Sequence, residues 1–116
     1  RLPVVAANAP AGPRRKVTSG GLEALSPEER PLVASELLPN SDAYWARFDA
    51  VMASHGGGEK PSAEQRLRNG QSIWDNTMGE SVVRALAAHP GHVVLLVVGR
   101  FHVEQGQGTA EQVERR

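Results

Sequence analysis

The sequence predicts an α/β domain in which parallel strands, buried on both faces, are covered by helices. Two apolar runs are the basis of this prediction: Leu2–Ala7 is short and rich in valine, and residues 93–98 are all valine or leucine. An apolar run without alternation is typical of a strand in the middle of a parallel sheet. Capped amphipathic helices lie between the runs, which gives the order strand, helices, strand, helix.

The chain has the length and composition of one ordinary domain. It contains 116 residues, of which 40% are hydrophobic and 22% charged, so it can form one core and is not broadly disordered. Two strands alone make a poor sheet. We therefore expect a single domain over residues 1–116 that either pairs with further strands or is the C-terminal part of a larger α/β domain.

Charge balance and the absence of cysteine exclude several classes of function. Thirteen basic residues balance thirteen acidic ones, so no overall field favours nucleic acid or an anionic membrane. A chain without cysteine has no disulfide scaffold, thiolate zinc site or thiol nucleophile. The longest apolar run, residues 93–98, is far shorter than the roughly 20 residues that cross a bilayer, so we expect no transmembrane segment.

Two amphipathic helices are expected in the middle of the chain, at roughly 42–55 and 63–88. Ser41 or Asp42 caps the first helix, and a glycine loop at residues 56–58 follows it. The apolar residues of the first helix recur at helical spacing. They are Tyr44, Trp45, Phe48, Val51 and Met52.

Shorter helices are expected on either side of this pair. Pro13 suits the first position of a short basic helix that Gly20 ends. Ser26 with Glu29 has the spacing of a capping box, which predicts another helix start. Thr109 is the expected cap of a last short helix.

The longer central helix has polar residues within an apolar stripe. The stripe consists of Leu67, Gln71, Trp74, Met78, Val82, Ala85 and Leu86. Asp75 follows Gln71 by one turn, near the edge of this face. A buried amide and carboxylate need partners, so the two could face a ligand, bond each other, or sit at a subunit seam. Gly70 and Gly79 weaken the helix and allow a bend at either position.

A candidate site lies where the second expected strand ends, at residues 99–104. Parallel sheets gather ligands at the carboxyl ends of their strands, so His102 and Asn8 are expected at the same edge. In an extended chain His102 and Glu104 point to one side, where the carboxylate can orient the imidazole. This pair suits a metal, a proton transfer or a porphyrin contact. The alternative is a histidine that is hydrogen-bonded in a loop.

Tyr44 is a second candidate because it is the only tyrosine in the chain. It shares a helical face with Phe48, and His55 ends the same expected helix. Tyrosine is one of the side chains that proteins use to bind haem iron. The alternative is a core residue whose hydroxyl reaches the rim of the core.

Several segments carry a resemblance to a known family. Leu2–Pro10 is similar to a strand-and-turn segment of that family, and Gly21–Arg30 is similar to the segment that follows it. Gln71–Ser81 resembles its lid helix, and Gly99–His102 with Gly106-x-Gly108 resembles its final strand and histidine loop. In this order, the segments resemble the C-terminal half of the ChaN-like haem-binding uptake proteins of the Tiki superfamily.

The resemblance implies an α/β fold with a helical lid over about 41–88, and it implies haem as the cofactor. In the family a tyrosine binds the iron, with histidine assistance near a dimer interface. This singles out Tyr44, His55 and His102 as the expected cofactor-binding residues. Further residues expected to line the site are Asn8, Gln71, Asp75 and Glu104.

The resemblance further implies a haem-binding protein of bacterial iron uptake. It implies a homodimeric lipoprotein on the periplasmic face of the outer membrane, with an outer-membrane haem uptake receptor as a partner. The cytoplasm is the alternative location. Two other functions stay open: a metal-dependent hydrolase or peptidase, as in the wider superfamily, and a fragment with only an assembly role.

Overall fold

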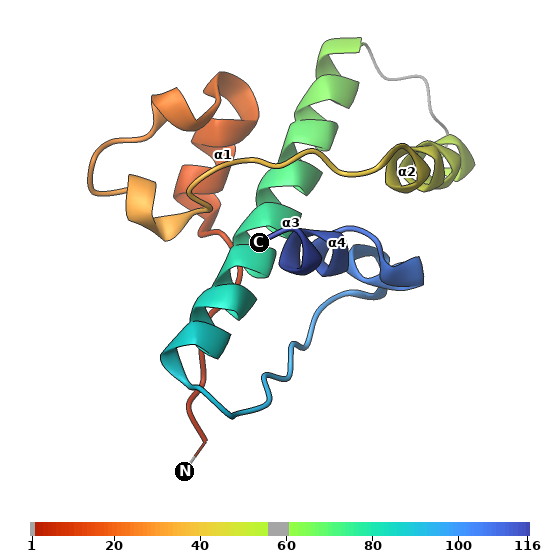
Figure 1. Cartoon of the computed structure of the whole chain (residues 1–116). Helices are drawn as coiled ribbons and strands as arrows, with labels where there is room; N and C mark the ends of the chain where they lie inside the picture. The colour runs from red at the N-terminus through yellow and green to blue at the C-terminus, as the bar shows by residue number, and fades with distance from the viewer. Residues whose placement is uncertain (1, 56–60) are drawn as a thin grey trace.

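Helices form the framework of the chain, and the longest one runs through the middle. The computed structural model describes residues 2–55 and 61–116. The α-helices are α1 (Ala11–Gly20), α2 (Asp42–Ser54), α3 (Pro61–Ala88) and α4 (Thr109–Glu114), and 3-10 helices lie at Leu22–Ala24, Arg30–Leu32, Arg100–His102 and Glu104–Gly106. In Figure 1, α3 separates α1 on one side from α2 and α4 on the other. None of the helices described is both long enough and apolar enough to span a membrane.

The predicted α/β fold class, with parallel strands under a helical lid, is wrong, because the described part of the chain contains helices but no β-strand. The two apolar runs, at 2–7 and 93–98, do not pair with each other. In the second run Val93, Leu95 and Val97 are 95%, 86% and 89% exposed. The residues between them are half-buried, so this run is not a strand buried on both faces.

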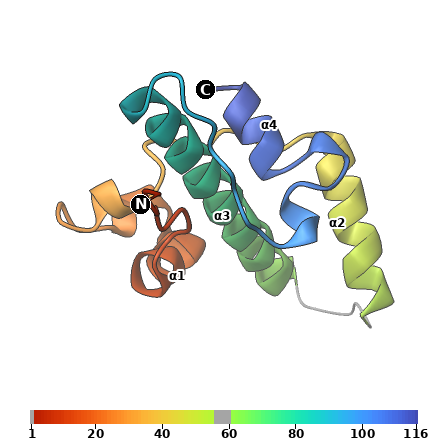
Figure 2. The same ribbon diagram turned by 90° about the horizontal axis from the view of Figure 1, so that it is seen from below.

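The physical reason is that a β-strand requires the backbone of a neighbour beside it. The first run passes instead along α3, where the Ser81 hydroxyl donates to the carbonyl oxygen of Ala7 over 3.0 Å. The second run leads away from the C-terminal end of α3 towards the loop before α4, as Figure 1 and Figure 2 show. The two runs have different neighbours, so no sheet forms between them.

The predictions for the two central helices are confirmed. The backbone N–H of Tyr44 donates to the Ser41 hydroxyl oxygen at 3.2 Å, which makes Ser41 the N-cap of α2. The second helix, expected at 63–88, is α3. The glycine loop expected at 56–58 lies outside the described residues. Capping and apolar spacing, which are local signals, were therefore sufficient for these elements.

The shorter elements follow the predictions in part. The basic helix expected from Pro13 to Gly20 is part of α1. Ser26 and Glu29 make both contacts of a capping box, at 3.0 and 3.3 Å. These contacts hold a turn that leads into a 3-10 helix instead of an α-helix. Pro31 lies in that element, where its missing N–H disfavours continuation as an α-helix.

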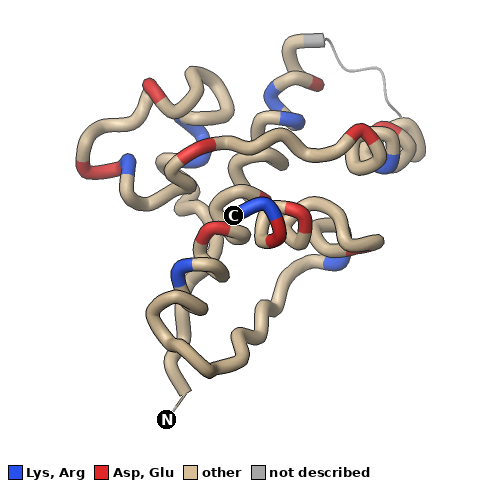
Figure 3. The backbone as a smooth tube through the Cα atoms, viewed as in Figure 1, with Lys and Arg blue, Asp and Glu red and all other residues tan. Residues whose placement is uncertain are grey.

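Two clusters of side chains pack against α3. On the α1 side the buried members of the apolar core are Ala9, Val17, Val33 and Ile73. The other cluster is aromatic and joins α2 to the loop before α4, with ring centroids 4.9 to 6.3 Å apart. Its members are Tyr44, Trp45, Phe48 and Phe101. Because the apolar core is small, polar contacts take a large part in holding the remaining segments. Acidic and basic residues both occur along α2 and α3 (Figure 3).

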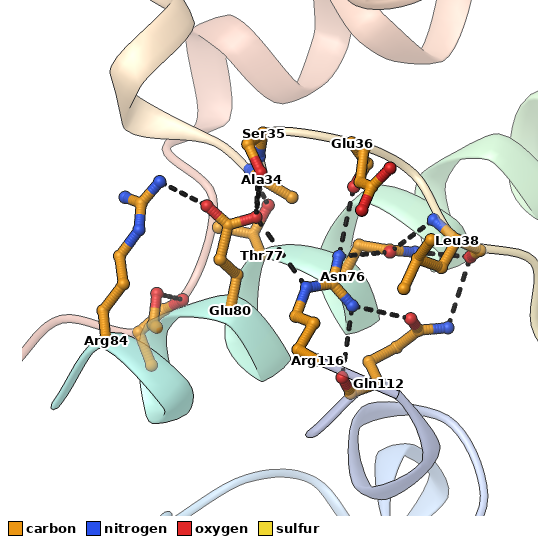
Figure 4. A network of polar contacts seen from close by, with 12 residues as sticks. Ala34, Ser35, Glu36, Leu38, Asn76, Thr77, Glu80, Arg84, Gln112 and Arg116 are labelled. Carbon is orange, nitrogen blue, oxygen red and sulfur yellow. Dashed lines mark hydrogen bonds and ion pairs between the residues drawn. The ribbon is translucent and has the colours of Figure 1, made fainter. Parts of the chain in front are cut away.

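The polar stretch of α3 (residues 75–81) holds the non-helical segment 34–38 (Figure 4). Side chains of α3 accept from the backbone N–H groups of this segment, as a neighbouring strand would. These hydrogen bonds join Ala34 N to Thr77 Oγ1 (3.1 Å), Ser35 N to Glu80 Oε2 (2.7 Å) and Leu38 N to Asn76 Oδ1 (2.8 Å). Arg116 also donates to Asn76 Oδ1 at 2.8 Å, which ties the residues after α4 to the same stretch.

Gly79 allows α4 to lie close to α3. A Cβ atom at this position would lie 2.6 Å from Gln112 Cβ and 3.1 Å from its carbonyl carbon. Gly70, in the same helix, has no atom within 4 Å of the corresponding position. The two glycines therefore differ: one is required by packing and the other only weakens the helix.

We expect Gly79→Ala to lower the free energy of unfolding by about 1–3 kcal/mol, because the new methyl group overlaps α4. Gly70→Ala is the matched control and is expected to raise it by up to about 1 kcal/mol, since alanine favours the helix. Urea unfolding followed by circular dichroism measures both. Stabilisation by both substitutions would contradict the close packing of α3 on α4.

Glu80 is expected to make stability depend on pH. Burial raises the pKa of this carboxyl group, but hydrogen bonds from Ser35 and the charges of Arg84 and Arg116 outweigh that effect and hold the pKa below its ordinary value. The stabilisation is therefore present above the pKa of the unfolded chain and is lost as the pH falls through the lower pKa of the folded chain.

Glu80→Gln removes the charge but keeps the size of the side chain. It is expected to lower the free energy of unfolding by about 1–2 kcal/mol at neutral pH. The difference from the wild type should shrink as the pH falls below the ordinary glutamate value of 4.5. Urea unfolding at neutral pH and at about pH 3 tests this. If the wild type and Glu80→Gln differ in free energy of unfolding by the same amount at both pH values, the Glu80 charge does not contribute to stability.

Candidate functional site

The carboxylate of Asp75 is the centre of a buried polar cluster beside α3. Asp75 is 0% exposed, and its Oδ1 atom lies 2.8 Å from His102 Nδ1 and accepts from the Thr109 hydroxyl at 2.9 Å. Its other oxygen accepts from the Asn40 side-chain amide at 3.3 Å. An ionised carboxylate only accepts hydrogen bonds, so this contact favours the tautomer of His102 that has its proton on Nδ1. In the neutral ring Nε2 then keeps its lone pair for a ligand or a proton.

Tyr44 lies within the same cluster as a neutral phenol. Its side chain is fully buried, and its hydroxyl donates to Gln71 Oε1 at 3.3 Å. Burial, and then the negative charge of Asp75, raise the pKa of this phenol well above its ordinary value. Both effects disfavour the phenolate, so the Tyr44 hydroxyl is available as a hydrogen-bond donor.

Arg47 holds the loop that carries His102. Its guanidinium donates to Gln107 Oε1 at 2.9 Å and to the Phe101 carbonyl oxygen at 3.0 Å. It also lies over the Phe101 ring, 4.2 Å from the centroid, and 3.4 Å from Glu104 Oε2. Glu104 pairs with Arg47 and Arg100, and Asp75 is the carboxylate that contacts His102.

Gly108 lets the backbone pass closely over the site. It has a φ of +62°, and a Cβ there would lie 2.7 Å from the His102 carbonyl oxygen. The same Cβ would lie 3.0 Å from Tyr44 Cε2 and 3.2 Å from Asp75 Oδ1. A side chain at this position would therefore collide with the cluster, and its backbone conformation also favours glycine.

The His102 ring is partly accessible and has aromatic neighbours. Its side chain is 18% exposed. The Trp74 and Phe101 rings meet it edge to face, with centroids 5.9 and 6.3 Å away. The His102 ring thus lies beside two aromatic rings, and its Nδ1 contacts the buried carboxylate of Asp75. Such an imidazole can bind a metal centre or accept a proton.

The structure brings together Tyr44, Gln71, Asp75 and His102. It places the other candidates elsewhere. Asn8 accepts from the backbone N–H of Ala9 at 2.8 Å and lines a different groove, with Glu80 and Arg84. His55 is exposed just after α2, at the opposite end of that helix from Tyr44, and its Nδ1 lies 2.7 Å from the Val51 carbonyl oxygen.

Sequence reasoning missed the roles of Asn40, Arg47, Gly108 and Thr109. The expectation that Thr109 caps the last helix is wrong, because Gly108 is the N-cap and the Thr109 hydroxyl points to Asp75. The backbone N–H of Gly108 donates to Glu111 at 3.2 Å. The available signal was the Gly-x-Gly spacing next to the histidine loop, whereas Asn40 and Arg47 reach the site only through tertiary packing.

Within residues 2–55 and 61–116, no group of three or more histidine, aspartate or glutamate side chains is arranged to hold a metal ion. Comparisons with curated proteins and with solved structures gave no match. A family model described as haem-binding uptake, Tiki superfamily, ChaN, matches residues 1–113. Since that match covers nearly the whole chain, including the cluster around Asp75, the protein belongs to the ChaN haem-binding uptake family of the Tiki superfamily.

Proposed function

We propose that this chain binds haem and that Nε2 of His102 is its ligand to the iron. The observation that carries the proposal is the 2.8 Å contact between His102 Nδ1 and the buried carboxylate of Asp75. Histidines that bind metals commonly donate their other ring N–H to a carboxylate, which fixes the ring and makes the free nitrogen more basic. Histidine is a frequent axial ligand of haem iron.

The surroundings of His102 fit such a group. Haem supplies the iron and its own ring nitrogens, so one imidazole can serve as the protein ligand. Trp74 and Phe101 offer aromatic surface beside this imidazole, which suits a large flat macrocycle. Asp75 would orient the ring, and Arg47 and Gly108 would hold the loop in place.

Tyr44 has a supporting role in this proposal. The Tyr44 side chain is 0% exposed, so the iron of a macrocycle that docks on the surface does not reach its hydroxyl in this structure. As a neutral donor, the Tyr44 hydroxyl instead holds Gln71 Oε1 at 3.3 Å. The iron ligand is therefore assigned to His102 and the positioning of Gln71 to Tyr44.

The biological setting is proposed from the family and from what the resemblance to it implies. In it the haem is cargo of bacterial iron uptake, handled on the periplasmic face of the outer membrane by a homodimer that works with a haem receptor. The description of the family as haem-binding uptake proteins supports the uptake of haem. The location, the homodimer and the receptor are proposed from the resemblance of the sequence to that family.

A second candidate function is hydrolysis with His102 as a general base. The observation that favours it is the same His102–Asp75 contact, since a carboxylate that holds one ring nitrogen prepares the other to accept a proton. The visible absorption spectrum of added haem distinguishes the two functions, because ligation of the iron by the protein changes this spectrum and hydrolysis does not.

We expect His102→Ala to weaken binding of ferric haem by more than about tenfold and to abolish the absorption change caused by imidazole ligation. His92→Ala is the matched control, because His92 is exposed at the other end of the 93–98 run. Titration of haem into each variant, followed by its visible spectrum, measures both effects.

Tyr44→Phe is the second comparison, and it should keep the ligand-dependent spectrum of the wild type. The assignment of His102 would be refuted if His102→Ala kept the wild-type spectrum of bound haem and Tyr44→Phe lost it. That result would identify Tyr44 as the iron ligand. Circular dichroism of each variant shows whether it is folded.

A further inference from the structure

Arg14 is an exception among the arginines that are half-buried in the described part of the chain. Each of the others donates to an oxygen atom of the protein. They are Arg30 with the Ala34 carbonyl (2.7 Å), Arg47 with the Phe101 carbonyl (3.0 Å), Arg68 with Glu64 (3.1 Å) and Arg116 with Asn76 (2.8 Å). Among the described residues, Arg14 has no such partner, and its guanidinium lies 4.6 Å from the centre of the Trp74 ring.

The packing of α1 explains why Arg14 points towards the site. Arg14 precedes the buried Val17 by three residues, so both lie on the face of α1 that packs against α3. Its neighbour Arg15 is exposed. The Arg14 side chain therefore reaches Trp74 on α3, whereas the side chain of Arg15 faces solvent.

Trp74 links the cation to the candidate ligand atom. The indole contacts the Arg14 guanidinium at 4.6 Å and the His102 ring at 5.9 Å, measured to the ring centres. A guanidinium that stacks on an aromatic ring still has N–H groups along its edge, and these match both oxygens of a carboxylate. A positive charge that has no anionic partner among residues 2–55 and 61–116 thus lies one aromatic ring away from His102.

We propose that Arg14 binds a carboxylate of the ligand whose metal centre His102 holds, which for haem is a propionate. This inference rests on the proposed function, and it names the residue that binds the charged group of the ligand. Binding by Arg14 would make the site selective for a porphyrin with free carboxylates. Arg14 supplies the charged anchor, Trp74 the flat surface and His102 the axial nitrogen.

The test compares ferric haem with its dimethyl ester, in which both propionates are blocked, under the same solvent conditions. Arg14→Gln should weaken the binding of haem by roughly tenfold, as expected for the loss of one charge-assisted hydrogen-bonded pair. The same substitution should leave the affinity for the ester unchanged. Arg15→Gln, the matched control, should alter neither affinity.

The outcomes separate this inference from the function on which it rests. If Arg14→Gln binds haem as tightly as the wild type while His102→Ala does not, the role of Arg14 is refuted and ligation by His102 stands. If Arg14→Gln weakens haem and ester equally, Arg14 acts only through packing on Trp74, which also refutes the inference. If the wild type shows no ligation that depends on His102, both proposals fail.

Discussion

The structure depends on the polar stretch of α3, because segments before and after this helix in the chain are hydrogen-bonded to it. Ser81 holds the N-terminal run, and Asn76, Thr77 and Glu80 hold residues 34–38. Asp75 holds Asn40, the His102 loop and the start of α4. Buried polar groups are costly without partners. In the described part of the chain no buried side-chain polar atom lacks one, so these segments and the stretch constrain each other.

This constraint also explains how a small helical framework forms a site. The apolar core contacts α1 and α3, whereas the loop with His102 is held by polar and aromatic contacts from α2, α3 and α4. Asp75 is fixed by Asn40 and Thr109, so it can fix His102 in turn. The close approach of the Gly108 backbone completes the cluster, since no other residue fits there without collision.

The parts that could be predicted from sequence were those that depend on local signals. The cap at Ser41 and the apolar spacing were sufficient for α2 and α3, and Gln71 and Asp75 stood out as polar residues that need partners. The apolar runs did not show whether they would pair as strands, because pairing depends on a neighbour that composition does not reveal. Adjacency suggested Glu104 as the partner of His102, whereas the fold brings Asp75 to it from α3. Arg47 and Asn40 reach the site only through tertiary packing.

The proposed function requires that Asp75 accepts the Nδ1–H of His102, which leaves Nε2 as the ligand atom. Nitrogen-15 NMR of the histidine rings tests it most directly, because the two ring nitrogens have distinct shifts in each tautomer. We expect neutral His102 to be protonated at Nδ1, and we expect Asp75→Asn, with the fold retained, to shift this preference. A ring protonated at Nε2 in the wild type, or a tautomer that does not respond to Asp75→Asn, would show that Asp75 does not set the His102 tautomer.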